Sequence, residues 1–453
     1  MKRILSGGTA LLALATCPLL ATAETPDPAL QDVIIVTGHR TTTVTDTALA
    51  PEAAPLTGVD ITRLIARTPG AARIGNGEMS GQMQYRGLFG PRLNLRIDGH
   101  SFASGGPNLM DPALHYAPTS LVSAVRIDRG ISPVSEGPGI GGGVDAVFKK
   151  TNYSNSSEAS LGYDLTIGER SVNDSVSTGG IIGASTDTWR ANLLGAYEEG
   201  GDTEYKDGTI GGSEFQRSIY GLATGLRTDL GEFSLDWRRH NTGFSGNPPF
   251  GMDIRFVDTD VLKAGYKTAF GNVLVEASAS YTDAAHGMNT FDLRPSMMQR
   301  EAFAYAITRK ADIAATFPAF GGSLQIGADT AEEDHNIHVV DPGNLDNFVY
   351  SLPDIVIDRT GAFAEWMGAL GAFNAELGLR VDDYDGTGGT ATFGADASMG
   401  QKMLAASYNA SDRSTDATTL DVAARLWRPI TDDLTWRVTL AQMAMQVRQL
   451  VGA

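Results

Sequence analysis

His286 and Met288 lie two residues apart and carry an imidazole and a thioether, which are both metal ligands. Side chains two residues apart share one face of a β-strand, so in a strand these two would lie side by side. Thioether sulfur favours reduced copper, and imidazole also suits copper. The pair is therefore a candidate site for a soft metal ion. The alternative is a loop histidine next to a methionine that fills a gap in the packing.

The segment before this pair alternates between polar and apolar side chains. The residues at even positions from Glu276 to Thr282 are polar, and the odd positions between them are apolar. If no bulge intervenes, the polar parity continues to His286 and Met288. Both side chains would then lie on the polar face of the strand.

Residues 373–382 and 434–440 show the same alternation. Many such segments of roughly ten residues are typical of a transmembrane β-barrel. A soluble β-sandwich also alternates, but its strands are shorter and its turns more evenly spaced. We therefore expect residues 151–441 to form an antiparallel transmembrane β-barrel of about fourteen strands. The carboxylates of Asp382 and Asp383 are expected at strand ends or turns, in contact with solvent.

A small mixed α/β domain is predicted over residues 56–150, before the barrel strands. Residues 59–70 have the character of a short helix, and residues 92–99 alternate like a strand that ends on an Asp-Gly turn. Residues 125–130 repeat the strand pattern, and residues 137–143 are rich in glycine. Charges on many of these strands argue against a large apolar core.

Residues 1–23 have the pattern of a secretory signal peptide. Basic Met1-Lys-Arg3 precedes an apolar run that ends at the small-residue cleavage site Ala21-Thr-Ala23. The only cysteine, Cys17, lies in this segment, so the exported chain would have no disulfide and no thiolate ligand. Export leaves the periplasm or the outer membrane as the location, and the strand pattern favours the outer membrane.

Neither nucleic-acid binding nor catalysis is supported. The formal net charge is −18, so no basic surface is available to meet phosphate. The chain has no Gly-x-Ser-x-Gly elbow and no His-Glu-x-x-His motif. The glycine-rich residues 137–143 lack the Lys-Ser/Thr of a phosphate-binding loop. We therefore predict that the protein is not an enzyme and has no catalytic cofactor.

Residues 24–55 form a flexible polar arm that contains one strand-forming segment. The segment consists of Asp32, Val33, Ile34, Ile35, Val36, Thr37 and Gly38. Because its neighbours offer no pairing partner, it is a candidate for pairing edge to edge with the sheet of another protein. The alternative is an N-terminal edge strand of the following domain.

In this order, the segments resemble the TonB-dependent outer-membrane receptors. The motifs that carry the resemblance are Tyr85-Arg-Gly87, Leu95-Arg-Ile-Asp-Gly99, Arg129-Gly130 and Gly141-Gly-Gly-Val144. The resemblance implies that residues 56–150 are a plug domain inside a barrel of roughly twenty-two strands. It implies that residues 32–38 are the TonB box, which passes a strand to the energy-transducing protein TonB. The implied location is the Gram-negative outer membrane, with its lipids around the barrel.

Three further segments resemble the copper-receptor branch of this family. They are Asn108-Leu-Met-Asp-Pro112, Phe250-Gly-Met-Asp-Ile254 and Asp283-Ala-Ala-His-Gly-Met288. In that branch a Cys-x-x-x-Met motif on the plug and a His-x-Met motif on the barrel hold one copper ion. The resemblance therefore implies that Met110, His286 and Met288 bind the transported ion, with Cu(I) favoured. The implied function is TonB-dependent uptake of copper ions.

The cysteine of that plug motif is absent, and Gly106 stands in its position. Met79 and Met83, from a neighbouring plug loop, could take part of its role. Thiolate is the strongest soft donor in such a site. Its absence keeps an iron–siderophore or another metal chelate open as the alternative cargo.

The expected strands of residues 151–441 fall short of the roughly twenty-two of the family. The alternation fails at residues 442–453, a helix-prone tail without the terminal aromatic residue usual in outer-membrane barrels. An open barrel edge in a bilayer leaves unpaired backbone groups. We therefore expect a C-terminally truncated receptor, and a non-functional truncated receptor is the further alternative to transport.

Overall fold

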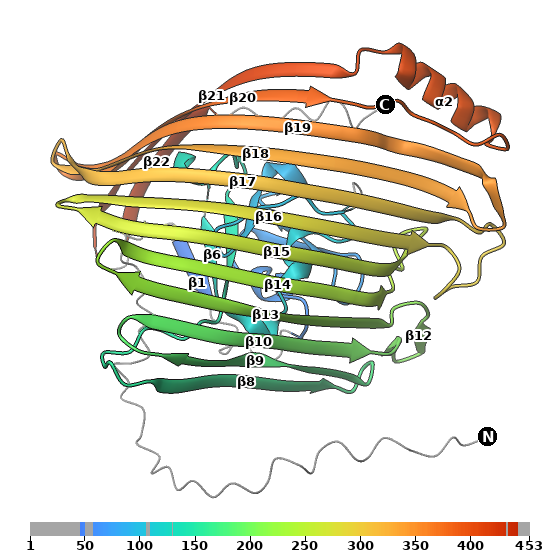
Figure 1. The fold of residues 1–453 in the computed structure, drawn as a ribbon, viewed down its shortest axis with the longest axis horizontal. Coiled ribbons are helices and arrows are strands. Elements are labelled where there is room, and N and C mark those ends of the chain that lie inside the picture. The colour runs from blue at the N-terminus through green and yellow to red at the C-terminus, as the bar shows by residue number, and fades with distance from the viewer. Residues whose placement is uncertain (1–45, 50–57, 106–108, 129, 432–433, 443–453) are drawn as a thin grey trace, which may run out of the picture. The chain divides into compact units, whose positions relative to one another are not determined.

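Antiparallel strands build most of the chain. The computed structural model describes residues 46–49, 58–105, 109–128, 130–431 and 434–442. In this part of the chain, 13 strands form one sheet in the order β22-β21-β20-β19-β18-β17-β16-β15-β14-β13-β10-β9-β8 (Figure 1). These strands are β8 (Ser160–Arg170), β9 (Ser175–Ser185), β10 (Trp189–Gly200), β13 (Phe215–Thr228), β14 (Gly231–Ser245), β15 (Asp253–Phe270), β16 (Val273–Asn289), β17 (Glu301–Ala319), β18 (Gly322–Asp341), β19 (Asn344–Leu370), β20 (Phe373–Thr387), β21 (Ser414–Pro429) and β22 (Thr435–Gln442). The antiparallel strands expected from the alternation are confirmed.

Several predicted features lie outside the described residues. They are the signal peptide (1–23), the TonB box (32–38), Gly106 and the tail from residue 443 onward. Among the residues that the structure describes, no helix combines the length and the apolar character needed to cross a bilayer.

Strand β20 shows the two faces of the sheet. Arg380 and Asp382 are buried, whereas the exposed fractions of Leu379 and Val381 are 48% and 43%. One face therefore presents apolar side chains outward, as expected of strands that cross a membrane. The prediction for Asp382 is wrong: it lies within the strand and forms ion pairs of 2.6 Å with Arg380 and with Arg359 of β19.

The central strands are longer than the roughly ten residues expected for a membrane-spanning strand. β16 has 17 residues, β18 has 20 and β19 has 27. At about 3.3 Å per residue, these strands are longer than the hydrocarbon core of a bilayer is thick. Strands of this length would extend beyond the hydrocarbon core of a bilayer.

The connections at the two ends of the sheet differ in length. At one end they are the short turns 186–188, 229–230, 271–272, 320–321, 371–372 and 430–434. At the other end, here called the long-loop end, they are 201–214 with the hairpin β11 (Thr203–Tyr205) and β12 (Gly208–Ile210), 246–252, 290–300 and 388–413 with helix α2 (Met399–Ala410), besides the shorter 171–174 and 342–343. In outer-membrane barrels short turns face the periplasm and longer loops the exterior. β16 ends at loop 290–300, so His286 and Met288 lie near the long-loop end.

The predicted small domain contains two small sheets, in the orders β1-β6-β7-β5 and β2-β3-β4. Strand β1 (Asp46–Leu49) lies in residues 24–55, which were predicted as a flexible arm, so that prediction is wrong for this strand, which pairs with β6. The strands within residues 56–150 are β2 (Ala71–Gly75), β3 (Gly81–Tyr85), β4 (Leu88–Phe89), β5 (Asn94–Ile97), β6 (Val122–Asp128) and β7 (Gly143–Phe148). The helices of the small domain are α1 (Thr62–Ile65) and the 3₁₀ turns η4 (Gly90–Arg92), η5 (Ala113–Tyr116), η6 (Thr119–Leu121) and η7 (Val134–Glu136). Helix α1 and strand β5 lie within the segments predicted for them. β6 begins three residues earlier than predicted, because its pairing with β7 includes Val122.

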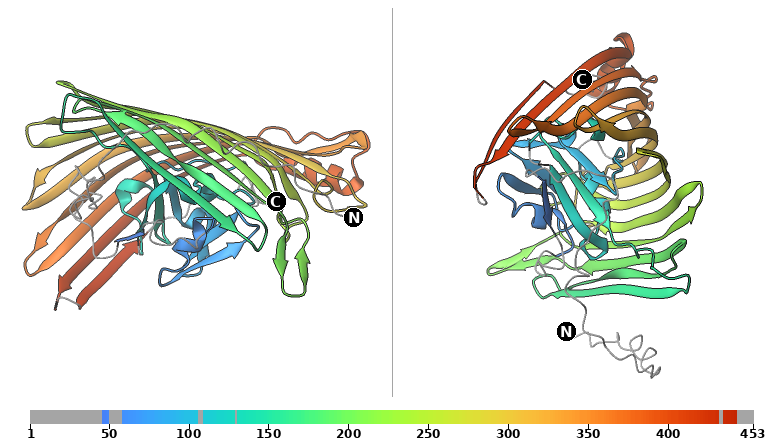
Figure 2. Two further views of the ribbon diagram at one scale, coloured as in Figure 1. Left: turned by 90° about the horizontal axis from the view of Figure 1, so that it is seen from below. Right: turned by 90° about the vertical axis from the view of Figure 1, so that its left-hand side faces the viewer.

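One buried apolar cluster joins the small domain to the sheet. From the small domain it includes Ile97, Met110 and Tyr116, and from the sheet Ile219, Ile254 and Met288. Figure 2 shows the small domain against the concave side of the curved sheet. The main apolar core is therefore shared between the small domain and the sheet.

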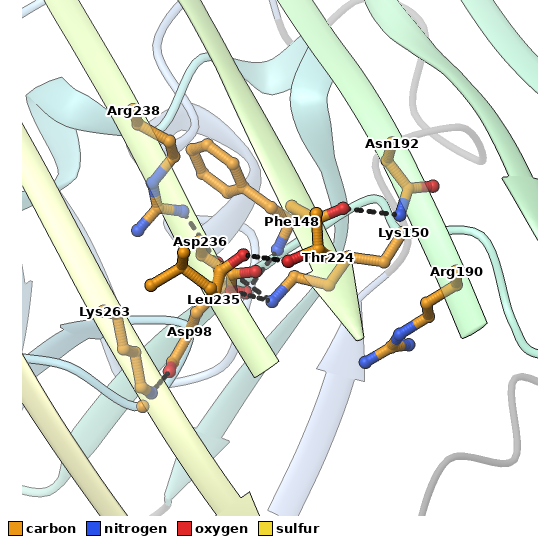
Figure 3. Close-up of polar contacts among 12 residues, drawn as sticks. Asp98, Phe148, Lys150, Arg190, Asn192, Thr224, Leu235, Asp236, Arg238 and Lys263 are labelled. Atoms are coloured by element: carbon orange, nitrogen blue, oxygen red, sulfur yellow. Dashed lines mark hydrogen bonds and ion pairs between the residues drawn. The ribbon is translucent and has the colours of Figure 1, made fainter. Parts of the chain in front are cut away.

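An ionic network also connects the small domain to β14 and β15 (Figure 3). The Asp98 carboxylate lies 2.7 Å from the Arg238 guanidinium and 3.8 Å from the Lys150 ammonium. Lys150 also pairs with Asp236 at 2.7 Å, and the Lys263 ammonium donates to the Asp98 carbonyl oxygen at 2.7 Å. Buried charges are tolerated only when paired, so these contacts hold the small domain in one position.

Candidate metal site

Strand β16 directs its polar parity toward the small domain. The Ser280 hydroxyl lies 2.9 Å from Nδ1 of His100, and the Thr282 hydroxyl lies 3.3 Å from Nε2 of the same ring. β16 pairs with β17 through His286 and Met288 without a register shift. The prediction that both residues continue the parity of Ser280 and Thr282 is therefore confirmed.

His286 meets the small domain at Asp111. The His286 Nδ1 atom lies 3.1 Å from Asp111 Oδ1, and both side chains are fully buried. Asp111 Oδ2 accepts hydrogen bonds from the Tyr116 hydroxyl at 2.7 Å and from the Gly105 N–H at 3.0 Å. Neither ring nitrogen of His286 makes a hydrogen bond of good geometry among the described residues. Nδ1 therefore meets Asp111 in a close polar contact, and Nε2 is buried without a polar partner in that part of the chain.

The ionisation of the small-domain groups fits this arrangement. Burial alone would raise the pKa of Asp111, but the charge of His286 and the hydrogen bonds from His286 and Tyr116 outweigh it and lower the pKa. Burial and the neighbouring Asp111 charge raise the pKa of the Tyr116 hydroxyl well above its ordinary value. Asp111 is therefore an ionised acceptor, and Tyr116 is a protonated donor.

The two predicted methionine ligands lie close to this contact in the fold. Met110 directly precedes Asp111 in the chain and is 2% exposed, and Met288 is 5% exposed. Both belong to the cluster that includes Ile254, the β15 residue paired with Met288. The structure thus brings Met110, His286 and Met288 into one buried region between the small domain and β16.

The other two predicted ligands are placed differently. Met83 is buried in the same cluster as Met110 and also lines a separate cavity. Met79 packs in a different cluster, with Val59 and Phe215. The structure therefore does not bring Met79 to His286.

The cavity has a volume of about 470 Å³ and lies between the small domain and strands β17, β18 and β19. Its apolar lining includes Leu95, Phe102 and Ile357, and its polar lining includes Glu333 and His335. A cavity of this size with mixed lining falls in the range that holds small organic ligands.

Sequence reasoning missed Asp111 and Tyr116. Among the described residues, no group of three or more His, Cys, Asp and Glu side chains is arranged to hold a metal ion. A metal site here would consequently depend on methionine sulfur. The one sequence feature that pointed to Asp111 was its place directly after the candidate ligand Met110. Its contact with His286 could not be predicted, because the two residues are distant in the sequence.

The comparisons with known proteins agree with this architecture. Residues 40–144 match the model of the TonB-dependent Receptor Plug Domain family. The chain carries the plug domain and the fold of a TonB-dependent receptor. The small domain is accordingly called the plug from here on. No curated protein matches the chain.

Among solved structures, the chain is similar to the copper transporter OprC, with a TM-score of 0.74 and 20% identity over 86% of this chain and 61% of that chain. It is also similar to the alcaligin outer-membrane receptor FauA from Bordetella pertussis, with a TM-score of 0.60 and 16% identity over 88% of this chain and 63% of that one. The FrpB iron transporter from Neisseria meningitidis matches with a TM-score of 0.63 and 13% identity, over 87% of this chain and 63% of that chain. The chain thus spans less than two thirds of each of these relatives.

Proposed function

We propose that the protein takes up copper ions across the outer membrane, with energy supplied through TonB. The proposal is supported by Nε2 of His286, which is buried without a polar partner among the described residues, and by Met110 and Met288, which share one buried cluster. One imidazole and two thioethers form a soft donor set, which favours Cu(I). The similarity to a copper transporter supports the same cargo.

Two of these ligands come from the sheet and one from the plug, so movement of the plug takes the site apart. In the proposed mechanism TonB binds residues 32–38 and pulls on the chain. Strand β1 follows this segment and is an edge strand, and among the described residues it pairs with β6 through four residues. Detachment of β1 would loosen the plug and withdraw Met110 from His286 and Met288. The ion would then pass to the periplasm.

A metal chelate is the second candidate cargo. The cavity of about 470 Å³ beside β17, β18 and β19 is large enough for a small chelator, whereas a bare ion needs no such space. The similarity to the alcaligin outer-membrane receptor FauA and to the iron transporter FrpB supports a cargo other than copper. In this alternative the chelate would lie against Phe102 and His335.

Copper uptake by cells that express the chain tests the proposal. Cells that express the native chain should accumulate more copper than cells without it from a medium with submicromolar free Cu(I). Cells that express the His286→Ala/Met288→Ala double variant should not, because two of the three ligands are removed. A Met79→Leu variant is the matched control, since Met79 lies in a separate cluster and its loss should leave uptake unchanged.

A variant lacking residues 32–38 should retain copper binding in the purified state but lose uptake. Heat-modifiable migration of each variant from outer-membrane fractions shows that it is inserted. Uptake that persists in the double variant, or that requires an iron chelate instead of free copper, contradicts the copper proposal. The second outcome would support the chelate receptor.

A further inference from the structure

We propose that Asp111 is a positioning residue for the ion: it directs Nε2 of His286 toward the site and supplies the negative charge that compensates a monovalent cation. This inference rests on the proposed function and specifies its substrate as a soft monovalent ion, Cu(I) or Ag(I). Asp111 would not bind the ion directly.

The first step concerns the orientation of the imidazole. Asp111 Oδ1 lies 3.1 Å from Nδ1 of His286, and an ionised carboxylate can only accept a hydrogen bond. The contact therefore favours the tautomer with hydrogen on Nδ1 and a lone pair on Nε2. Metal-bound histidines commonly donate their other N–H to a carboxylate in this way, which fixes the ring and raises its basicity.

The second step concerns the rigidity of Asp111. Its Oδ2 is held by the Tyr116 hydroxyl and the Gly105 N–H. The Tyr116 ring packs edge-on against Phe102 at 5.0 Å and against His240 of β14 at 5.5 Å. The carboxylate is thus fixed by both the plug and the sheet before an ion arrives.

The third step concerns charge. When an ion binds, Nε2 of His286 must carry no proton, so Met110, Met288 and His286 then contribute no charge, and the only cysteine of the chain, Cys17, lies far from them in the sequence. An uncompensated cation in a buried site is strongly disfavoured. The single charge of Asp111 balances Cu(I) or Ag(I), whereas a divalent ion would leave one positive charge uncompensated. The carboxylate thus performs the charge compensation that a thiolate ligand would otherwise provide.

Affinity measurements on the full chain in detergent test this inference. The probes are Ag(I) and Cu(I), each in competition with a chromogenic chelator. Asp111→Asn should weaken binding of both ions by about 10- to 100-fold, the usual effect of losing such a partner. Asp111→Glu keeps the charge and should recover most of the affinity, which a purely structural role does not predict. X-ray absorption should still show one nitrogen and two sulfur ligands in Asp111→Asn.

Asp60→Asn is the matched control, because Asp60 is a buried plug carboxylate that pairs with Arg73 inside the plug and not with His286. It should leave ion affinity unchanged in the folded protein. If Asp111→Asn does not fold, the Tyr116→Phe variant tests the inference instead, and we expect its affinity for the ions to be several-fold weaker. Native-like affinity in Asp111→Asn, or in Tyr116→Phe where it is needed, overturns the inference. If the native chain binds neither ion, the proposed function itself fails.

Discussion

At the residue scale, buried charge determines how the plug is held. Asp98 and Arg238 are each 6% exposed and pair across the interface between plug and sheet. Burial alone would raise the pKa of Asp98, but the charges of Lys150 and Arg238 and the hydrogen bond from the Phe148 N–H lower it well below its ordinary value. The surroundings therefore favour the ionised carboxylate, which is the form that pairs with Arg238.

Asp98→Asn should destabilise plug docking by about 3 to 5 kcal/mol, since it leaves the buried Arg238 without its carboxylate partner, whereas Lys150 keeps Asp236. Because the folded pKa of Asp98 is lowered, its contribution is fully present above the unfolded value of about 3.9 and is lost as pH falls below it. Hydrogen exchange of the β5 and β7 amides measures the stability of plug docking. In the native chain, protection of these amides should decrease when the pH is lowered below about 4, and the decrease should be less steep in Asp98→Asn.

Arg239→Gln provides the control for this prediction. Arg239 pairs with Asp260 at a position where both side chains are about one third exposed, so its loss should cost no more than about 1 kcal/mol. Equal protection of β5 and β7 in Asp98→Asn and in the native chain would show that the network of Figure 3 does not hold the plug.

The candidate ligands differ in how far the sequence could predict them. His286 and Met288 follow from a two-residue period, which is a local property of strand β16. Asp111 and Tyr116 could not be found in this way, because their roles arise only when the plug meets β16. Asp382 pairs both with Arg380, two residues away on the same strand, and with Arg359 of β19. Only the second partner is distant in the sequence.

At the element scale, the plug segment around Gly105 approaches β16 very closely. A Cβ atom at Gly105 would lie 2.7 Å from the Cβ of His286. Real Cβ atoms do not approach each other to this distance, so either the plug segment or the strand would have to shift. The glycine therefore permits the contact between Asp111 and His286.

Gly105→Ala should weaken Ag(I) binding several-fold and destabilise the protein by about 1 to 3 kcal/mol, because overpacking forces the plug segment away from the strand. Thermal unfolding and chelator competition measure the two effects. Gly251→Ala is the control, since nothing lies within 4 Å of a Cβ there. Unchanged ion affinity in Gly105→Ala would show that the ion does not require this approach.

The lengths of the strands were the part of each element that the sequence predicted least well. The alternation in residues 373–382 identified β20 correctly, yet the strand continues to Thr387. The residues beyond the expected membrane thickness pair with β19 and β21 through backbone hydrogen bonds. Backbone pairing does not require the apolar outer face on which the prediction was based.

At the scale of the whole molecule, the order of segments was more informative than any one of them. A polar mixed domain that precedes alternating strands predicted a plug against a sheet, and the shared apolar cluster shows why neither part could be understood alone. Most buried residues of this cluster belong to the plug, so the expectation that its charges exclude a large apolar core is wrong, and a smaller set of sheet residues completes the core. The site is a consequence of that same packing.

The central claim is that one soft ion binds where the plug meets β16. Anomalous diffraction from crystals soaked in Ag(I) or Cu(I) tests it most directly. We expect one strong peak within bonding distance of Met110, His286 Nε2 and Met288, and no peak there in the His286→Ala/Met288→Ala variant. A peak at another location, or none at this one in the native protein, would contradict the account.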